Sequence, residues 1–249
     1  ARLPGAPDGT KGISLFAVPK FLVKDDGSIG ERNEVHCLSL EEKLGIHASP
    51  TAVMSYGGDK GAVGYLVGEE NRGLMHMFTM MNNARHAVGR EGLAISESAY
   101  QLALQYAMER KQGNVIGTAT QAAIVEHSDV KRMLMRMKAL TEAMRGLTYT
   151  CAYAFDVAER ATDEQECSRA SRRGDLLTPV VKGWCTDNAQ IVASLGVQIH
   201  GGMGFVEETG AAQYMRDARI LPIYEGTNGI QALDLMGRKT LDRKSTRLN

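Results

Sequence analysis

The residues best suited to chemistry in this chain are those of segment 223–231, Ile-Tyr-Glu-Gly-Thr-Asn-Gly-Ile-Gln. Its one carboxylate, Glu225, lies between Tyr224 and Gly226, just ahead of a helix-like run. A carboxylate held among apolar and flat groups keeps its proton more tightly than in water, so Glu225 is a candidate general base for a weakly acidic C–H. The alternative is a first-turn helix acid favoured by the helix dipole, and the segment alone favours that reading at least as much.

Two further glycine-bearing segments could contact a ligand. Segment 106–113 (Tyr-Ala-Met-Glu-Arg-Lys-Gln-Gly) carries Arg110 and Gln112, and segment 198–205 (Gln-Ile-His-Gly-Gly-Met-Gly-Phe) begins at Gln198. Glycine lets a backbone pass close to a ligand, and arginine offers a fork for phosphate. The alternative is an exposed helix-end cation at the first segment and C-capping glycines between helices. The second segment lacks the third glycine of a dinucleotide-binding fingerprint and follows a helix, not a strand.

The elements that must position these segments fall into a β part and a helical part. Up to residue 68 the pattern predicts strands, separated by turn signals such as Asp-Asp-Gly-Ser at 25–28. The predicted strands are 13–18, 35–40, 52–56 and 62–67.

From about residue 70 the apolar period becomes helical. A first helix is expected to about Arg110, and a second along an apolar stripe from Val130 to Phe155. The polar stretch 162–174 reads as a loop, and Thr178-Pro179 as the start of a third helix. Shorter helices are expected around 211–215 and 227–238.

The expected fold is therefore α+β: the end of a small β-barrel or sandwich domain over 1–69, then an antiparallel bundle of long helices over 70–240. Residues 241–249 have no apolar period and are expected to be disordered or foreign to the protein.

Composition narrows the classes of partner. The chain has 249 residues, 43% hydrophobic, with a formal net charge of +0, so no basic field for nucleic acid or an anionic membrane is expected. No apolar run is long enough to span a bilayer, and no signal peptide is visible. The four cysteines are scattered, which favours a reducing compartment and predicts no metal site. The expected location is the bacterial cytoplasm, or the mitochondrial matrix in a eukaryote.

Taken in order, the three segments resemble motifs of the acyl-CoA dehydrogenase family. Segments 41–51 and 65–74 are similar to that family's middle β-domain and to its passage into the C-terminal helices. The likeness covers nearly the whole chain to about Thr240, and segment 228–235 is closest to a longer subgroup that includes 3-methylmercaptopropionyl-CoA dehydrogenases. Because the family begins with a helical domain that this sequence lacks, the resemblance implies a fragment truncated at its N-terminus.

The resemblance implies FAD-dependent α,β-dehydrogenation of an acyl-CoA thioester, as in β-oxidation of fatty acids. Glu225 would abstract the α-proton, and the β-hydride would go to flavin N5. The backbone N–H of Glu225 and a flavin hydroxyl would hydrogen-bond the thioester oxygen, worth ~3 kcal/mol per donor. Tyr224 would line the slot, and Gly226 would let acyl chain and flavin approach.

The resemblance also implies roles for the other segments. The residues implied in FAD binding, partly across a subunit boundary, are Arg110, Gln112, Gln198, Gly201, Gly202 and Thr227. Arg85 lies where the family has an arginine near the acyl-CoA site, and Asn82 stands where it often has an aspartate. The phenylalanine that usually follows Gln112 is missing, and Gly229 replaces a frequent glutamine.

The implied partners are an acyl-CoA substrate, an electron-transfer flavoprotein as acceptor and further copies of the chain in a homo-oligomer, a tetramer. An acyl-CoA oxidase, or a non-catalytic flavoprotein or interaction module of the same fold, is the alternative. The length of the acyl chain is not determined by this sequence.

Overall fold

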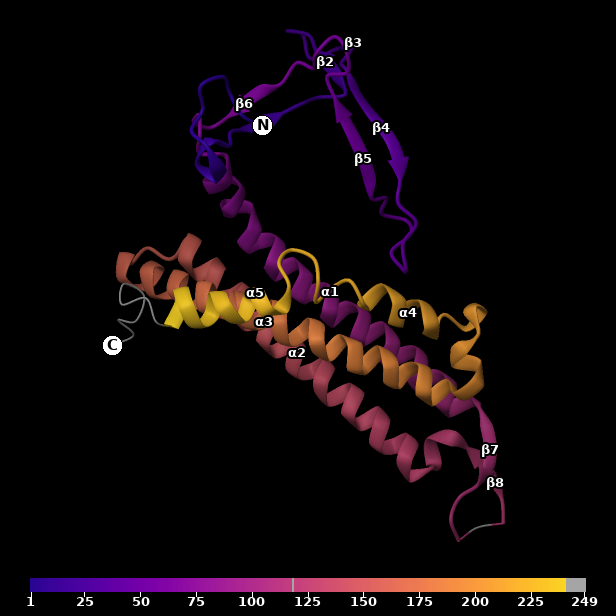
Figure 1. The fold of residues 1–249 in the computed structure, drawn as a ribbon. Helices are drawn as coiled ribbons and strands as arrows, with labels where there is room; N and C mark the ends of the chain where they lie inside the picture. The colour runs from indigo at the N-terminus through magenta and orange to yellow at the C-terminus, as the bar shows by residue number, and fades with distance from the viewer. Residues whose placement is uncertain (118, 241–249) are drawn as a thin grey trace. The chain divides into compact units, whose positions relative to one another are not determined.

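The computed structural model describes residues 1–117 and 119–240 (Figure 1). The chain divides into two compact units, Ala1–Met81 and the part from Asn82 onward. The long helix α1, Gly73–Glu109, contains the division between them.

The first unit is built from antiparallel two-stranded ladders. β1 pairs with β6, β2 with β3, and β4 with β5. A short 3-10 turn, Gly9–Gly12, precedes the strands. The strand bounds are β1 Leu15–Ala17, β2 Phe21–Val23, β3 Ile29–Arg32, β4 Val35–Leu40, β5 Ala52–Tyr56 and β6 Tyr65–Val67.

The four strands predicted from sequence are present, and two more flank the predicted turn. Strands β2 and β3 form a hairpin around it, where Asp26 accepts hydrogen bonds from the backbone N–H and the hydroxyl of Ser28. Neither strand shows the apolar alternation that identifies a strand in sequence, because β2 is Phe-Leu-Val and β3 is Ile-Gly-Glu-Arg. Within the described residues the ladders are separate rather than one closed barrel.

The second unit is a bundle of long helices joined by short connections. In Figure 1, α2 runs back along α1, and α3 runs back along α2. The elements after α1 are β7 Lys111–Asn114, β8 Gln121–Ala123, η2 Ile124–Glu126, α2 Ser128–Arg160, α3 Glu164–His200, η3 Gly201–Phe205, η4 Glu207–Thr209, α4 Ala211–Ala218, α5 Asn228–Leu233 and a π-helical turn η5 Asp234–Thr240.

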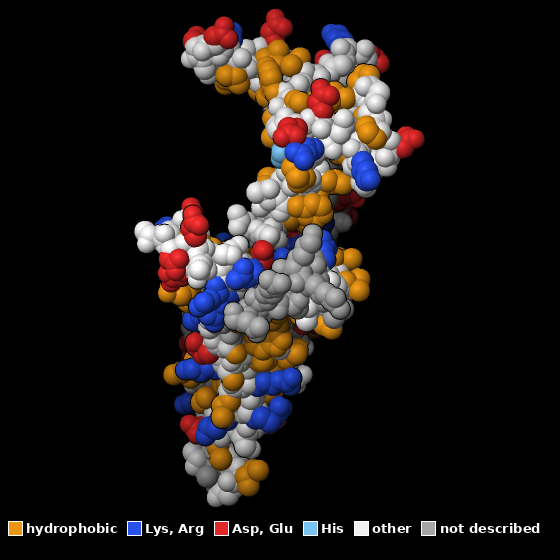
Figure 2. All heavy atoms as spheres, turned by 90° about the vertical axis from the view of Figure 1, so that its left-hand side faces the viewer, with side chains coloured by type: hydrophobic (Ala, Val, Ile, Leu, Met, Phe, Trp, Pro, Cys, Tyr) orange, Lys and Arg blue, Asp and Glu red, His pale blue; other side chains and the backbone are white. Residues whose placement is uncertain are grey.

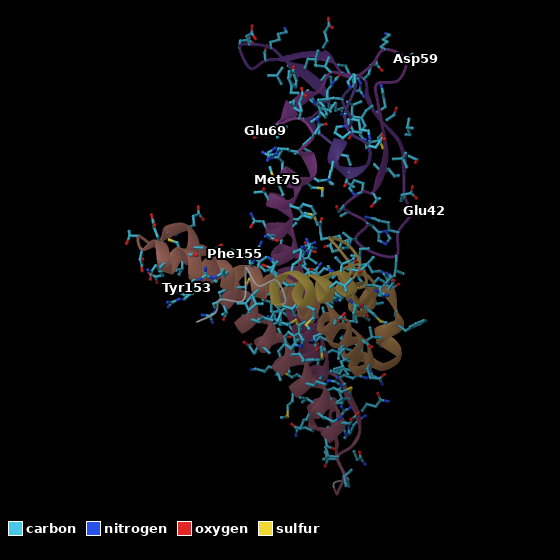
Figure 3. The ribbon with its side chains drawn as sticks, turned by 60° about the vertical axis from the view of Figure 1, so that its left-hand side comes forward. Glu42, Asp59, Glu69, Met75, Tyr153 and Phe155 are labelled. Carbon is cyan, nitrogen blue, oxygen red and sulfur yellow. The ribbon has the colours of Figure 1, made fainter. Side chains whose placement is uncertain are left out.

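The predicted apolar stripe of α2 forms the centre of this unit. Met137, Met144 and Cys151 are fully buried between α1 and α3. The charged residues of the other faces point outward, and on one face Lys and Arg side chains are interspersed with apolar ones (Figure 2). Near the C-terminal end of α2, Tyr153 is exposed while Phe155 packs against the core (Figure 3).

Glycines set the close approach of α3 to both neighbours. A Cβ at Gly89 of α1 would lie 2.4 Å from Cγ1 of Val181, and one at Gly92 would lie 3.0 Å from the carbonyl oxygen of Cys185. On the other side, a Cβ at Gly174 of α3 would lie 2.7 Å from the ring of Phe155. The three helices therefore pack at distances that only a residue without a side chain permits.

The predicted start of the third helix is wrong. Helix α3 begins at Glu164, where Asp163 caps it by accepting a hydrogen bond from the N–H of Gln165 at 3.0 Å. Polarity indicated a loop over 162–174, but the stretch packs one face against α2 and keeps helix-forming residues on the other. Pro179 lies inside the helix, not at its start. The adjacent Thr178 hydroxyl donates to the carbonyl of Gly174 at 2.8 Å.

None of the described helices has the length and apolar character needed to cross a membrane. Among the same residues there is no group of three or more His, Cys, Asp or Glu side chains arranged for a metal ion. The predicted C-terminal tail, 241–249, lies outside the described residues.

Candidate active site

Glu225 lies at the apex of a short loop between α4 and α5. The backbone N–H of Asn228 donates to the carbonyl of Pro222 at 3.0 Å and closes this loop at its base. Glu225 has a φ of 54° and Gly226 a φ of 86°, so two successive residues adopt the left-handed conformation. That conformation is strained for a residue with a side chain, and it persists only where surrounding contacts hold it. The side chain of Glu225 is exposed to solvent.

Two buried side chains hold the carbonyl oxygens of the loop. Arg85 of α1 donates from Nε to the carbonyl of Glu225 at 3.4 Å. Gln231 of α5 donates from Nε2 to the same carbonyl at 3.5 Å and to that of Gly226 at 3.1 Å. These contacts, one from α1 and the others from α5, explain how the left-handed turn is maintained.

A buried ion pair supports Arg85. Its Nη1 lies 3.3 Å from Oδ2 of Asp234, and the two side chains are only 7% and 5% exposed. The second carboxylate oxygen of Asp234 lies 2.8 Å from Nε of Arg238, which is largely exposed. Buried charges persist when they are paired and hydrogen-bonded. This network therefore fixes the guanidinium of Arg85 next to the carbonyl of Glu225.

The other end of the loop is fastened to α3 through Asn228. Its amide nitrogen donates to the carbonyl of Gly183 at 3.1 Å, to the hydroxyl of Thr186 at 3.0 Å and to the carboxylate of Asp187 at 2.7 Å. Its amide oxygen accepts from the Nζ of Lys182 at 2.9 Å. Lys182 is fully buried, and this desolvation lowers its pKa from 10.5 to about 8.

Tyr224 is half-buried beside the base. Its hydroxyl donates to a carboxylate oxygen of Glu91 on α1. Burial, followed by the hydrogen bond to Glu91, raises the pKa of Tyr224, so the phenol stays protonated. The ring is thereby held in one orientation next to Glu225.

The backbone N–H of Glu225 is unused. Among the described residues no acceptor is hydrogen-bonded to it, although its own carbonyl is held twice. A backbone donor beside a carboxylate is an arrangement that can polarise a carbonyl oxygen while the carboxylate removes a neighbouring proton.

The structure places the predicted site residues in two groups. Arg85, Tyr224, Gly226 and Thr227 belong to the neighbourhood of Glu225, whereas Asn82 lies one turn before Arg85 on α1 and contacts α3. The Asn82 amide donates to Asp175 at 3.4 Å, and the Thr227 hydroxyl caps α5 by accepting from the N–H of Ile230 at 3.4 Å.

The remaining predicted residues lie at the far end of the bundle. There the rings of Tyr106 and His200 stack with centroids 4.4 Å apart, which brings the ends of α1 and α3 together. Arg110 follows α1, Gln112 lies in β7, and both are exposed. Gln198, Gly201 and Gly202 are also exposed, and both glycines have open space where a Cβ would be.

Sequence reasoning missed the residues that support the loop. They are Glu91, Lys182, Gln231 and Asp234, together with the side-chain role of Asn228. For Lys182 a signal existed, because it lies four residues from both Thr178 and Thr186 on the buried face of α3. The contacts of Glu91 with Tyr224 and of Asp234 with Arg85 join residues far apart in sequence, whereas Gln231 lies only five and six residues from the carbonyls that it holds.

Comparison with known proteins identifies the family. Residues 71–240 match the family "Acyl-CoA dehydrogenase, C-terminal domain". The chain is 56% identical over 97% of its length to a 3-methylmercaptopropionyl-CoA dehydrogenase of Ruegeria pomeroyi, of which it covers 41%. It spans about two fifths of the length of the first curated relatives it matches.

Solved structures share the fold. The chain is similar to butyryl-CoA dehydrogenase from Megasphaera elsdenii, with a TM-score of 0.68, 27% identity, and coverage of 92% of this chain and 53% of that one. It is also similar to a structure described as Bd2924 in its apo form, with a TM-score of 0.84, 26% identity, and coverage of 98% and 45%. The matched family accounts for the helical unit that carries the Glu225 loop, and the chain therefore belongs to the acyl-CoA dehydrogenase family.

Proposed function

We propose that the complete protein catalyses α,β-dehydrogenation of an acyl-CoA thioester with FAD, and that Glu225 is the base that takes the α-proton. The observation that carries this proposal is the loop geometry. An exposed carboxylate and an unused backbone N–H belong to the same residue, whose left-handed conformation is maintained by buried side chains. Family membership supports the reaction class.

The backbone N–H and the carboxylate of Glu225 would have different roles in removing the proton. An α-proton of a thioester is a weak acid, and a hydrogen bond to the thioester oxygen stabilises the charge that develops there. The N–H of Glu225 would donate this bond, while the carboxylate accepts the proton. Tyr224 and Gly226 border the space where the acyl group would lie, and Arg85 supports the loop from below.

The exposed residues at the far end of the bundle would suit a cofactor such as FAD bound across a subunit boundary, with Thr227 contributing from beside Glu225. Arg110 forms no ion pair among the described residues, and its guanidinium suits a pyrophosphate. Gln112, Gln198 and Thr227 add exposed polar groups, and the open space over Gly201 and Gly202 admits a close approach. When bound, FAD supplies N5 as the acceptor for the β-hydride.

We further propose that this protein works as a homo-oligomer and passes its electrons to an electron-transfer flavoprotein. A relative named for 3-methylmercaptopropionyl-CoA and others named for butyryl-CoA suggest the first substrates to test. An oxygen electrode distinguishes a dehydrogenase from an oxidase, because only an oxidase consumes oxygen during turnover.

The variant Glu225→Gln tests the base. In the complete FAD-bound protein we expect acyl-CoA to bleach the flavin rapidly in the wild type and at least about a hundredfold more slowly in E225Q, with FAD content unchanged. Glu208→Gln is a matched control, since Glu208 is exposed on η4 and outside the loop. Bleaching of E225Q at the wild-type rate would contradict the proposal.

A further inference from the structure

Resting on the proposed function, we propose that Lys182 is a positioning residue for the base. Its buried ammonium group holds Asn228 at the foot of the Glu225 loop and so determines where the carboxylate lies.

The burial of Lys182 is the first observation. Its relative exposure is 0%, although lysine is among the residues least often buried. It occupies the stripe of α3 that faces the bundle interior, between Thr178 and Thr186. A buried ammonium is unfavourable unless a polar partner compensates it, and the Nζ of Lys182 donates to the amide oxygen of Asn228 at 2.9 Å.

Asn228 links this ammonium to the loop. Its side chain is bound to one turn of α3, through Lys182, Gly183, Thr186 and Asp187. Its backbone N–H donates to the carbonyl of Pro222 at 3.0 Å, which closes the loop of residues 222–228. A displacement of Asn228 therefore displaces the end of the loop that leads directly into Gly226 and Glu225.

Lys182 also acts on the charge balance of the site. The groups whose charges affect it come from three elements: Arg85 on α1, Asp187 on α3 and Glu225 in the loop. Arg85 and Lys182 are both buried cations, and the carboxylate of Glu225 is close enough to Lys182 for its charge to favour the ammonium form. Removal of the ammonium group of Lys182 therefore changes both the position of the loop and the electrostatic potential at the carboxylate of Glu225.

The test compares Lys182→Met, Asn228→Ala and the double variant in the complete FAD-bound protein, with 3-methylmercaptopropionyl-CoA as the probe. We expect K182M to keep its FAD and to slow flavin bleaching by about 10- to 100-fold, since small misplacements of a reacting group have effects of this size. Because proton removal becomes more rate-limiting, the isotope effect with α-deuterated substrate should increase, which simple destabilisation would not cause.

The double variant tests whether Lys182 acts on Glu225 through Asn228. If Lys182 acts through Asn228, the double variant should bleach no more slowly than the slower single variant. Thr178→Val is the matched control, because Thr178 is equally buried on α3 but its hydroxyl bonds Gly174 rather than the loop. T178V should lose stability while retaining both the bleaching rate and the isotope effect.

The outcomes separate the two proposals. Bleaching of K182M within about threefold of wild type, or a double variant whose loss is the product of the single losses, overturns the role of Lys182 alone. If the FAD-bound wild-type protein is not bleached by the probe or by butyryl-CoA, both proposals fall together.

Discussion

Nε of Arg85 donates a hydrogen bond to the carbonyl of Glu225 at 3.4 Å, across 140 positions of sequence. The same guanidinium is paired with the buried carboxylate of Asp234. Arg85 on α1 thus contacts both the backbone of the candidate base and Asp234, which begins the π-helical turn η5 after α5.

Replacement of Arg85 by Met should destabilise the protein by about 3 kcal/mol, because it leaves the carboxylate of Asp234 buried with only the exposed Arg238 as partner. Urea unfolding of the wild type, R85M, D234N and the double variant measures this. The double variant should be less destabilised than the sum of the single variants. Additive losses would show that the pair does not contribute as described.

Replacement of Gly226 by Ala should destabilise the loop by roughly 1–3 kcal/mol and slow bleaching of the flavin. The residue has a φ of 86°, and a Cβ would lie 3.0 Å from Nε2 of Gln231, the group that holds the loop carbonyls. Gly146→Ala is the control: Gly146 is exposed on α2 with open space around it. G146A should stabilise the protein by roughly 0.5–1 kcal/mol. Equal stability changes in both variants would refute the argument.

Replacement of Gly89 by Ala should cost about 1–3 kcal/mol of stability, since the new methyl group would lie 2.4 Å from Cγ1 of Val181 and 3.1 Å from its carbonyl oxygen. Thermal unfolding compares G89A, V181A and G89A/V181A. A smaller side chain at position 181 makes room for the methyl group, so the double variant should be more stable than additivity predicts. If the two losses simply add, the close approach of α1 and α3 at this point is not limiting.

The stability contributed by Lys182 should rise with pH between about 8 and 10.5. Burial, the largest cause, and the charge of Arg85 lower its pKa to about 8, while Asp187 and Glu225 oppose the shift. In that window the unfolded chain binds more protons than the native one, so the unfolding free energy increases with pH. The full shift corresponds to about 3 kcal/mol.

This pH dependence is measured as a difference between two proteins. Unfolding free energies of wild type and K182M, determined by urea titration from pH 7 to 10.5, cancel the titration of the other groups. The unfolding free energy of K182M relative to that of the wild type should be highest below pH 8 and should fall as the pH rises above 8. A constant difference across the range would exclude a lowered pKa for Lys182.

The elements that periodicity can identify were predictable from sequence. The apolar stripe of α2 and the strands β4 and β5 appear where spacing places them. The motif segments around Arg110, Gln198 and Glu225 were sufficient to identify the family, because each motif is a short continuous stretch of sequence. Polarity misled at 162–174, since a helix that packs with one face needs few apolar residues when glycine and alanine make the contact.

The arrangement around Glu225 was decided only by the tertiary structure. Arg85 and Asp234 are 149 positions apart, Lys182 and Asn228 are 46 apart, and each pair is joined by packing between different elements. The left-handed conformation at Glu225 is likewise imposed by Arg85 and Gln231, against the local preference of glutamate. A sequence pattern reports which faces are apolar, whereas a buried polar contact depends on which two faces meet, and only the folded chain determines that.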